Sequence, residues 1–152
     1  MFGFLKERKA EKDAADKIGV EIHRQIMSAF QRNEAITGTR IPSFFTVGYL
    51  YGFVRIGFTT LGINGEQAAD KWMKHICDGV LPGRLWESFG RLLAALELAK
   101  SLNKEDEIKL FEVGIEAGAF DAGAFNPFSN TKASNLAKYL VGDDIEYSPL
   151  PE

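Results

Sequence analysis

Few side chains in this sequence have the chemistry for catalysis or metal binding. The 152 residues include two histidines, His23 and His75, and one cysteine, Cys77. His75 and Cys77 are two positions apart, and residues at this spacing on a helix point in different directions, so they cannot easily share one ion. A zinc site needs three or four ligands, and a second cysteine is absent from the sequence. We therefore predict no metal site and no cofactor.

Two other pairs could in principle support catalysis. Cys77 with His23 would supply a nucleophile and a base, but nothing in the sequence brings the two together. Cys77 falls on the apolar face of its expected helix, which favours a buried, inert thiol. Glu112 and Glu116 lie one helical turn apart, as a pair of catalytic carboxylates would, but this spacing is also common on helix surfaces. Neither pair indicates an active site.

Arginine and aromatic residues are the better candidates for binding. Arg55 is the only charged residue in the longest apolar run, residues 42–62. Its planar guanidinium could bind a carboxylate or phosphate, or its stem could pack while its head reaches solvent or an acidic neighbour. The aromatic side chains could line a ligand pocket, anchor a partner or fill the core. The predicted binding residues are Arg55, Tyr49, Tyr51, Trp72, Phe120, Phe125 and Phe128.

The last three of these residues belong to a segment with an unusual composition. Residues 117–121 (AGAFD) are followed by the near-copy 122–126 (AGAFN), which is too short a repeat to indicate a solenoid. Helical periodicity alone does not bury the phenylalanines of this segment. They could plug one end of a helical bundle, or they could form an exposed apolar patch of the kind found at interfaces.

The apolar run 42–62 must position most of these candidates. At about 100° per residue, its bulky residues share one helix face, whereas Gly48 and Gly52 fall on the opposite face and would let a second backbone come close. A β-hairpin is the first alternative, because aromatic and β-branched residues favour sheets. A membrane span is the second, but an arginine near the bilayer centre opposes it. We predict a buried core helix.

The remaining periodicity predicts an all-α fold. A long first helix is predicted, with its charged early part (6–17) in solvent and its apolar stripe from Ala14 to Phe30 docked. Further helices are predicted from 65 to 79, from 84 to 102, after Asn103, and from 129 or 130 to 142, while residues 33–41 break the pattern. We therefore expect a single-domain bundle of five or six helices around the glycine-containing central helix, with 84–102 as its main partner. The domain should cover residues 1–142, with residues 1–12 frayed, and an acidic, Pro-containing tail (143–152) should be disordered.

Composition narrows the class of partner. The net charge is −3, and Lys and Arg are scattered among Asp and Glu, which argues against nucleic acid binding. One cysteine excludes an internal disulfide framework and fits a reducing compartment. The chain becomes charged from Lys6, so it lacks the apolar core of a signal peptide. These features predict a cytoplasmic protein without a membrane span.

Three functions are compatible with the sequence. It favours a non-catalytic protein-binding module, such as an adaptor, an inhibitor or an immunity-type protein, because it shows no credible active site. The alternative is a helical bundle that holds a small apolar ligand or a lipid between its helices, near Tyr49, Tyr51 and Trp72. A small enzyme of unknown reaction is the third hypothesis. A homodimer is compatible with each, since the glycine stripe and the phenylalanine segment both offer a surface.

Overall fold

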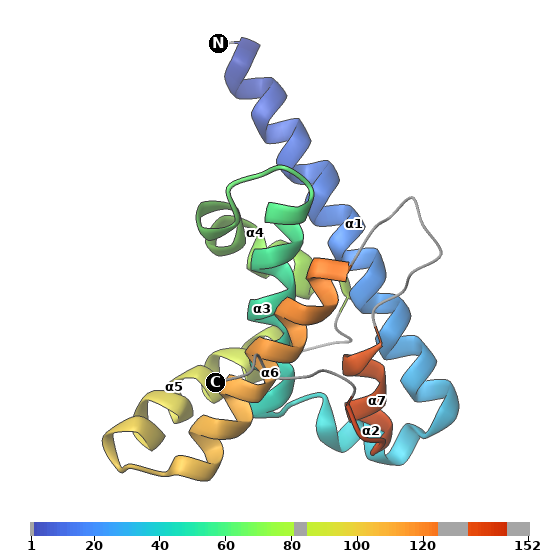
Figure 1. Ribbon diagram of the computed structural model, residues 1–152, viewed down its shortest axis with the longest axis vertical. Helices are drawn as coiled ribbons and strands as arrows, with labels where there is room; N and C mark the ends of the chain where they lie inside the picture. Colours follow the sequence, from blue (N-terminus) through green and yellow to red (C-terminus); the bar gives the residue numbers. More distant parts are fainter. Residues whose placement is uncertain (1, 81–84, 125–133, 146–152) are drawn as a thin grey trace.

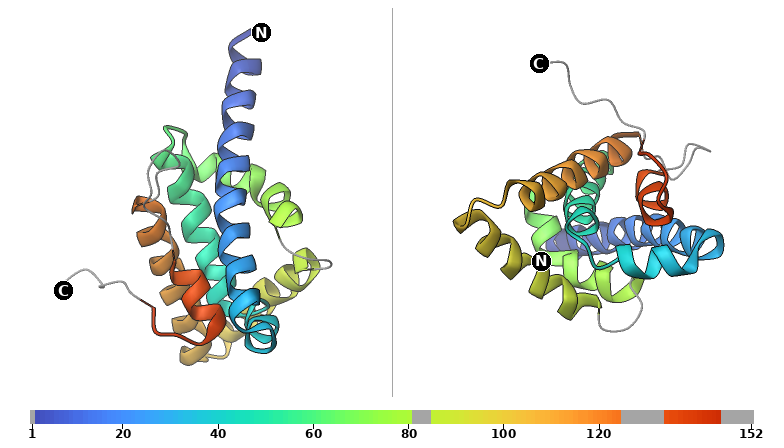
Figure 2. Two further views of the ribbon diagram at one scale, coloured as in Figure 1. Left: turned by 90° about the vertical axis from the view of Figure 1, so that its right-hand side faces the viewer. Right: turned by 90° about the horizontal axis from the view of Figure 1, so that it is seen from below.

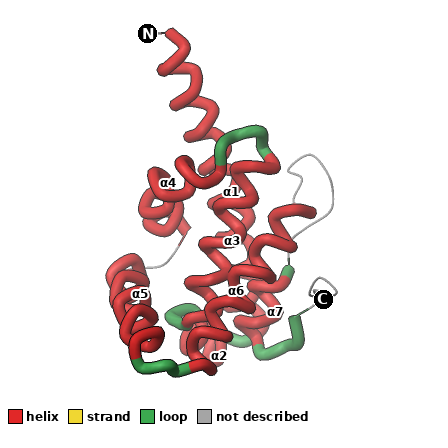
Figure 3. The backbone as a smooth tube through the Cα atoms, turned by 60° about the vertical axis from the view of Figure 1, so that its left-hand side comes forward, coloured by secondary structure: helices red, strands yellow, loops and turns green. Residues whose placement is uncertain are grey.

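The computed structural model describes residues 2–80, 85–124 and 134–145. Within these ranges all regular structure is helical (Figure 3), which confirms the all-α class. The helices are α1 (Phe2–Arg32), α2 (Glu34–Arg40), α3 (Phe44–Thr60), α4 (Gly65–Val80), α5 (Leu85–Ser101), α6 (Glu105–Ala124) and α7 (Asn135–Val141). The described ranges thus hold seven helices where we expected five or six.

The additional helix is α2, in the segment that we expected to be irregular. Asn33 caps its start, because the Asn33 side chain accepts a hydrogen bond of 3.2 Å from the backbone N–H of Ile36. Thr37 is buried in its middle and donates a hydrogen bond of 3.1 Å to the carbonyl of Leu140, next to the end of α7. A contact across the chain therefore stabilises a helix that is too short to be recognised by periodicity.

Helix α1 is much longer than the others and docks through its second half. Ile18, Ile22 and Ile26 are fully buried on one stripe, as the sequence predicts. The first turns of α1 are also helical and extend beyond the other helices (Figures 1 and 2), and residues 5–10 are exposed. Within the described ranges, none of the helices combines the length and the apolar character needed to cross a lipid bilayer.

Helix α3 carries the apolar run and is buried along most of its length. Ser43 caps it, with its hydroxyl accepting a hydrogen bond of 3.2 Å from the N–H of Thr46, so Pro42 precedes the helix instead of lying in its first turn. Helix α3 contacts α1, α4, α5 and α6, and it lies side by side with α6 in Figures 1 and 2. Its position brings the apolar run against four other helices.

Glycines bring α3 and α6 into direct backbone contact. A Cβ atom at Gly48 would overlap the carbonyl oxygen of Phe111, and one at Gly52 would overlap that of Ile115. The contact is reciprocal, since a Cβ atom at Gly114 or Gly118 would overlap the α3 backbone. Helix α6, and not 84–102 as we expected, is therefore the main partner of α3. Side chains hold most helix pairs 8–10 Å apart, but these glycines remove that spacer.

We expect Gly52→Ala to lower the free energy of unfolding by about 3 kcal/mol or more, because the added methyl group would force α3 away from α6. Urea unfolding followed by far-UV circular dichroism measures this change. Gly90→Ala is the matched control, since Gly90 lies within α5 and a Cβ atom there would meet nothing within 4 Å. The control should be stabilised by about 0.5–1 kcal/mol through helix propensity alone. Equal effects at both positions would contradict the backbone contact.

Candidate functional site

The structure separates the residues that the sequence predicts to bind. Tyr49 and Trp72 are buried in the core, whereas Tyr51 and Arg55 line one cleft between α3, α5 and α6. Phe120 lies on α6 with 51% of its surface exposed. Phe125 and Phe128 lie outside the described residues. These residues therefore do not form a single site.

Tyr49 belongs to a buried polar cluster that it forms with Gln25, Asp121 and Asn135. The Tyr49 hydroxyl donates to Oδ2 of Asp121 at 2.6 Å and accepts from Nε2 of Gln25 at 2.9 Å. Asn135 donates to Asp121 twice, through its backbone N–H and its side-chain amide, at 2.9 Å each. The Oε1 atom of Gln25 accepts from the N–H of Ala137 at 3.1 Å. The cluster joins α1, α3, α6 and α7.

The buried polar cluster has the composition of an acid–base site but is closed. Removal from water raises the pKa of Asp121, although hydrogen bonds from Tyr49 and Asn135 and from the backbone of Ser134 oppose this rise. Removal from water also raises the pKa of Tyr49 well above its ordinary value. Gln25, Tyr49 and Asn135 are almost completely inaccessible, and Asp121 is buried. A substrate could not reach these groups, so the cluster's role in this arrangement is to hold four helices together.

Trp72 and Glu11 make a second polar contact between elements. The Trp72 indole N–H donates to Oε2 of Glu11 at 2.8 Å, and Lys71 Nζ lies 2.9 Å from the same oxygen. These two donors, Trp72 first, lower the pKa of the Glu11 carboxyl. The contact links α4 to α1 and accounts for the buried position of Trp72.

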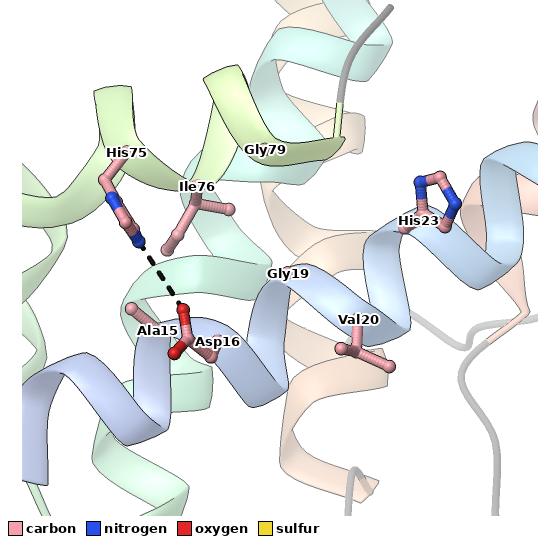
Figure 4. A pocket seen from close by; sticks show the side chains of 8 residues that line it. All are labelled: Ala15, Asp16, Gly19, Val20, His23, His75, Ile76 and Gly79. Atoms are coloured by element: carbon pink, nitrogen blue, oxygen red, sulfur yellow. Dashed lines mark hydrogen bonds and ion pairs between the residues drawn. The ribbon is translucent and has the colours of Figure 1, made fainter.

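An open groove of about 400 Å³ lies between α1 and α4 (Figure 4). Its lining is mostly apolar and includes two glycines, one on each helix. His75 reaches across the groove to Asp16, with Nε2 and Oδ1 3.5 Å apart. Val20 lies beside them with 70% of its surface exposed. We call this hollow the α1–α4 groove. It is lined by Ala15, Asp16, Gly19, Val20, His23, His75, Ile76 and Gly79.

The α1–α4 groove contains both histidines but no catalytic pair with Cys77. The thiol of Cys77 is fully buried, and burial raises its pKa to about 12. His23 is exposed on α1 and lines the groove, which Cys77 does not. Among the residues that the structure describes, no three His, Cys, Asp or Glu side chains are placed to hold a metal ion.

A smaller cleft of about 230 Å³ lies between α3, α5 and α6. We call it the Arg55 cleft, after the residue at its mouth. Arg55 is exposed and pairs with Glu66 of α4, with 2.6 Å between a guanidinium nitrogen and Oε1. Tyr51 packs against Phe89 and Phe111 by its ring. The Arg55 cleft is lined by Tyr51, Gly52, Arg55, Leu93, Leu96, Glu97, Lys100, Phe111 and Ile115.

Sequence reasoning missed the buried polar cluster, although a signal for it was present. Asp121 lies three and four positions after Gly118 and Ala117, on the small-residue face of α6, and Gln25 interrupts the isoleucine stripe of α1. A polar residue on an otherwise apolar face indicates a buried hydrogen bond. Glu112 and Glu116, by contrast, are both exposed on the surface of α6.

Comparisons of the chain with protein-family models, with characterised proteins and with solved structures gave no match. The function of the chain therefore has to be inferred from its own geometry.

Replacing Asp121 by Asn should lower stability by about 1–3 kcal/mol at pH 7, because an amide NH₂ would face donors that now meet an oxygen. The folded-state pKa of Asp121 is raised, so the folded protein binds this proton more tightly than the unfolded chain. Wild type should therefore gain stability relative to Asp121→Asn as the pH falls from 7 towards about 4. Urea titrations of both proteins at several pH values measure the difference. A constant difference would contradict the raised pKa.

The thiol of Cys77 should not react with Ellman's reagent at pH 8 in the folded protein, because the thiol is buried and its pKa is about 12. The same protein in urea should react completely. The measurement is the absorbance of the released thionitrobenzoate with time. Rapid reaction without urea would show that Cys77 is accessible and would reopen the question of a nucleophile.

Proposed function

We propose that the protein is a non-catalytic, cytoplasmic protein-binding module and that its docking surface is the α1–α4 groove. The observation that carries this proposal is the difference between the buried polar cluster and the open α1–α4 groove. The Tyr49–Asp121 pair is buried and closed to a substrate. The groove is open and mostly apolar, and its histidine–carboxylate contact, between His75 Nε2 and Asp16 Oδ1, is 3.5 Å long. Such a surface suits the binding of another molecule better than the transformation of one.

The lining of the α1–α4 groove suits an α-helix of a protein partner. Two helices form its walls, as in other complexes in which a helix lies in a groove. Gly79 of α4 is an exposed small residue of the lining, whereas Ala15 and Gly19 of α1, four positions apart, are buried within the fold. Small residues let a further backbone approach closely. The exposed Val20 would be covered by such a helix.

Charge also favours a protein partner over nucleic acid. The groove carries one carboxylate, Asp16, and two histidines, and the whole chain has a net charge of −3. Binding to a phosphate backbone requires a cluster of lysines and arginines, and none of the groove residues is a lysine or an arginine. An apolar stripe with few charges on the partner helix matches this lining.

Val20→Glu tests the proposal. Native mass spectrometry of the tagged chain, isolated gently from its own cells, should find wild type in complex with one other polypeptide. The variant should retain at most about a tenth of the partner that wild type retains, because burying the new carboxylate in a largely apolar interface carries a desolvation cost. Leu98→Glu is the matched control: Leu98 is 59% exposed on α5, away from the groove, and this variant should retain the partner as wild type does.

A photoreactive residue in place of Val20 then locates the partner. It should crosslink the same polypeptide, whereas the same residue in place of Leu98 should not. Equal retention by Val20→Glu and Leu98→Glu would place the partner elsewhere and overturn the proposal. Crosslinking only to a second copy of this chain would make the groove a homodimer interface instead, and a protein that stays monomeric would leave the groove without a protein occupant.

A further inference from the structure

We propose that the Arg55 cleft binds a small monocarboxylate with an apolar tail. This site is independent of the α1–α4 groove, because the two sets of lining residues have no member in common. Three features of the cleft point to such a ligand: its apolar walls, the guanidinium of Arg55 among its lining residues and its volume.

The walls of the Arg55 cleft come from three helices and are largely hydrocarbon. Leu93 and Leu96 of α5 face Phe111 and Ile115 of α6, and the ring of Tyr51 belongs to α3. Leu96 is almost completely buried, whereas Leu93, Phe111 and Ile115 are partly exposed. Partly exposed apolar groups around a hollow lose unfavourable contact with water when a hydrocarbon tail fills it.

Two cationic side chains line the cleft, and each has one carboxylate near it. Arg55 of α3 and Lys100 of α5 belong to the lining together with Glu97, and Glu66 lies beside Arg55, so the four charges sum to zero. Lys100 Nζ lies 3.5 Å from Glu97, and Arg55 is paired with Glu66 through one terminal nitrogen. A guanidinium has five N–H donors in a fork that matches a carboxylate. A ligand carboxylate would therefore compete with the exposed Glu66 for Arg55.

The volume of the cleft limits the length of the tail. A dry cavity of about 150 Å³ holds benzene, so 230 Å³ corresponds to on the order of nine or ten non-hydrogen atoms. Octanoate has this size and supplies both the carboxylate and the tail. At this size we expect a dissociation constant on the order of a millimolar or below.

The test is a titration of the whole ¹⁵N-labelled chain with octanoate, octanol and acetate, followed by two-dimensional NMR. Octanoate should shift the amides around the Arg55 cleft in a saturable way and bind about tenfold more tightly than octanol, which lacks the charge-assisted hydrogen bond. Acetate, which lacks the tail, should cause no saturable shift in the same concentration range. Octanol binding as tightly as octanoate would show that the charged mouth takes no part and would overturn the proposal.

Three variants assign the roles at the mouth. Arg55→Gln should weaken octanoate binding about tenfold, and Glu66→Gln should strengthen it about two- to fivefold by removing the competing ion pair. Arg91→Gln is the control, because Arg91 is an exposed arginine of α5 that faces Glu87 at 3.9 Å and does not line the cleft. Unchanged binding to Arg55→Gln, or shifts confined to amides far from the cleft, would contradict the assignment.

Discussion

The backbone contact between α3 and α6 is the constraint on which the rest of this fold depends. Each helix contributes two glycines four residues apart, and the carbonyl oxygens of the opposite helix occupy the places where four Cβ atoms would be. At such short separations Cα–H groups can contact carbonyl oxygens directly, which adds a weak attraction to the dispersion between the backbones. No side chain remains at these positions to adjust, so the relative placement of the two helices has little freedom.

This fixed placement determines the geometry of the buried polar cluster. Tyr49 follows Gly48 on α3, and Asp121 lies three residues after Gly118 on α6, so the glycine contact brings the phenol within 2.6 Å of the carboxylate. The carboxylate then receives both donors of Asn135 at the start of α7, while Gln25 ties the phenol to α1. A buried carboxylate is costly unless its donors are held in place. The glycine contact holds one of them, and the cost of burial appears as the raised pKa of Asp121.

The sequence predicts the local features of this fold better than its pairings. Periodicity is sufficient for the buried stripe of α1 and for the helical form of residues 44–60. The spacing of Gly48 and Gly52 indicates that some backbone comes close, but spacing does not say which one, and we assigned the wrong main partner because α5 has the stronger apolar face. Gly114 and Gly118 of α6 have the same spacing as Gly48 and Gly52, and together the two pairs indicate which helices come close. Helix α2 escaped prediction because its stability depends on Thr37 and a residue 103 positions away.

For the candidate sites, too, individual residues could be predicted from the sequence, but their grouping in space could not. Arg55 and Tyr51 were selected from residue type, because a guanidinium can bind a carboxylate and an aromatic ring can line a pocket, although both types also pack in protein cores. That they line one cleft follows from the packing of α5 and α6 against α3, which no local pattern contains. The α1–α4 groove was not predicted, since it depends on how two helices that are not consecutive in the chain meet. Tyr49 and Trp72 were selected for the same reason as Tyr51, but tertiary contacts bury both.

Helix α4 connects the two open surfaces and sets a limit on how strongly they can influence each other. It carries His75, Ile76 and Gly79 of the α1–α4 groove, and it also carries Glu66, the partner of Arg55. A ligand that takes Arg55 from Glu66 would release only an exposed ion pair, which is worth about 1 kcal/mol or less. The start of α4 is held independently, because a Cβ atom at Gly65 would overlap the carbonyl oxygen of Arg55. Coupling is reciprocal, so occupation of either surface should change affinity at the other by no more than about fivefold through this contact. We therefore expect a ligand at one surface to have little effect on binding at the other.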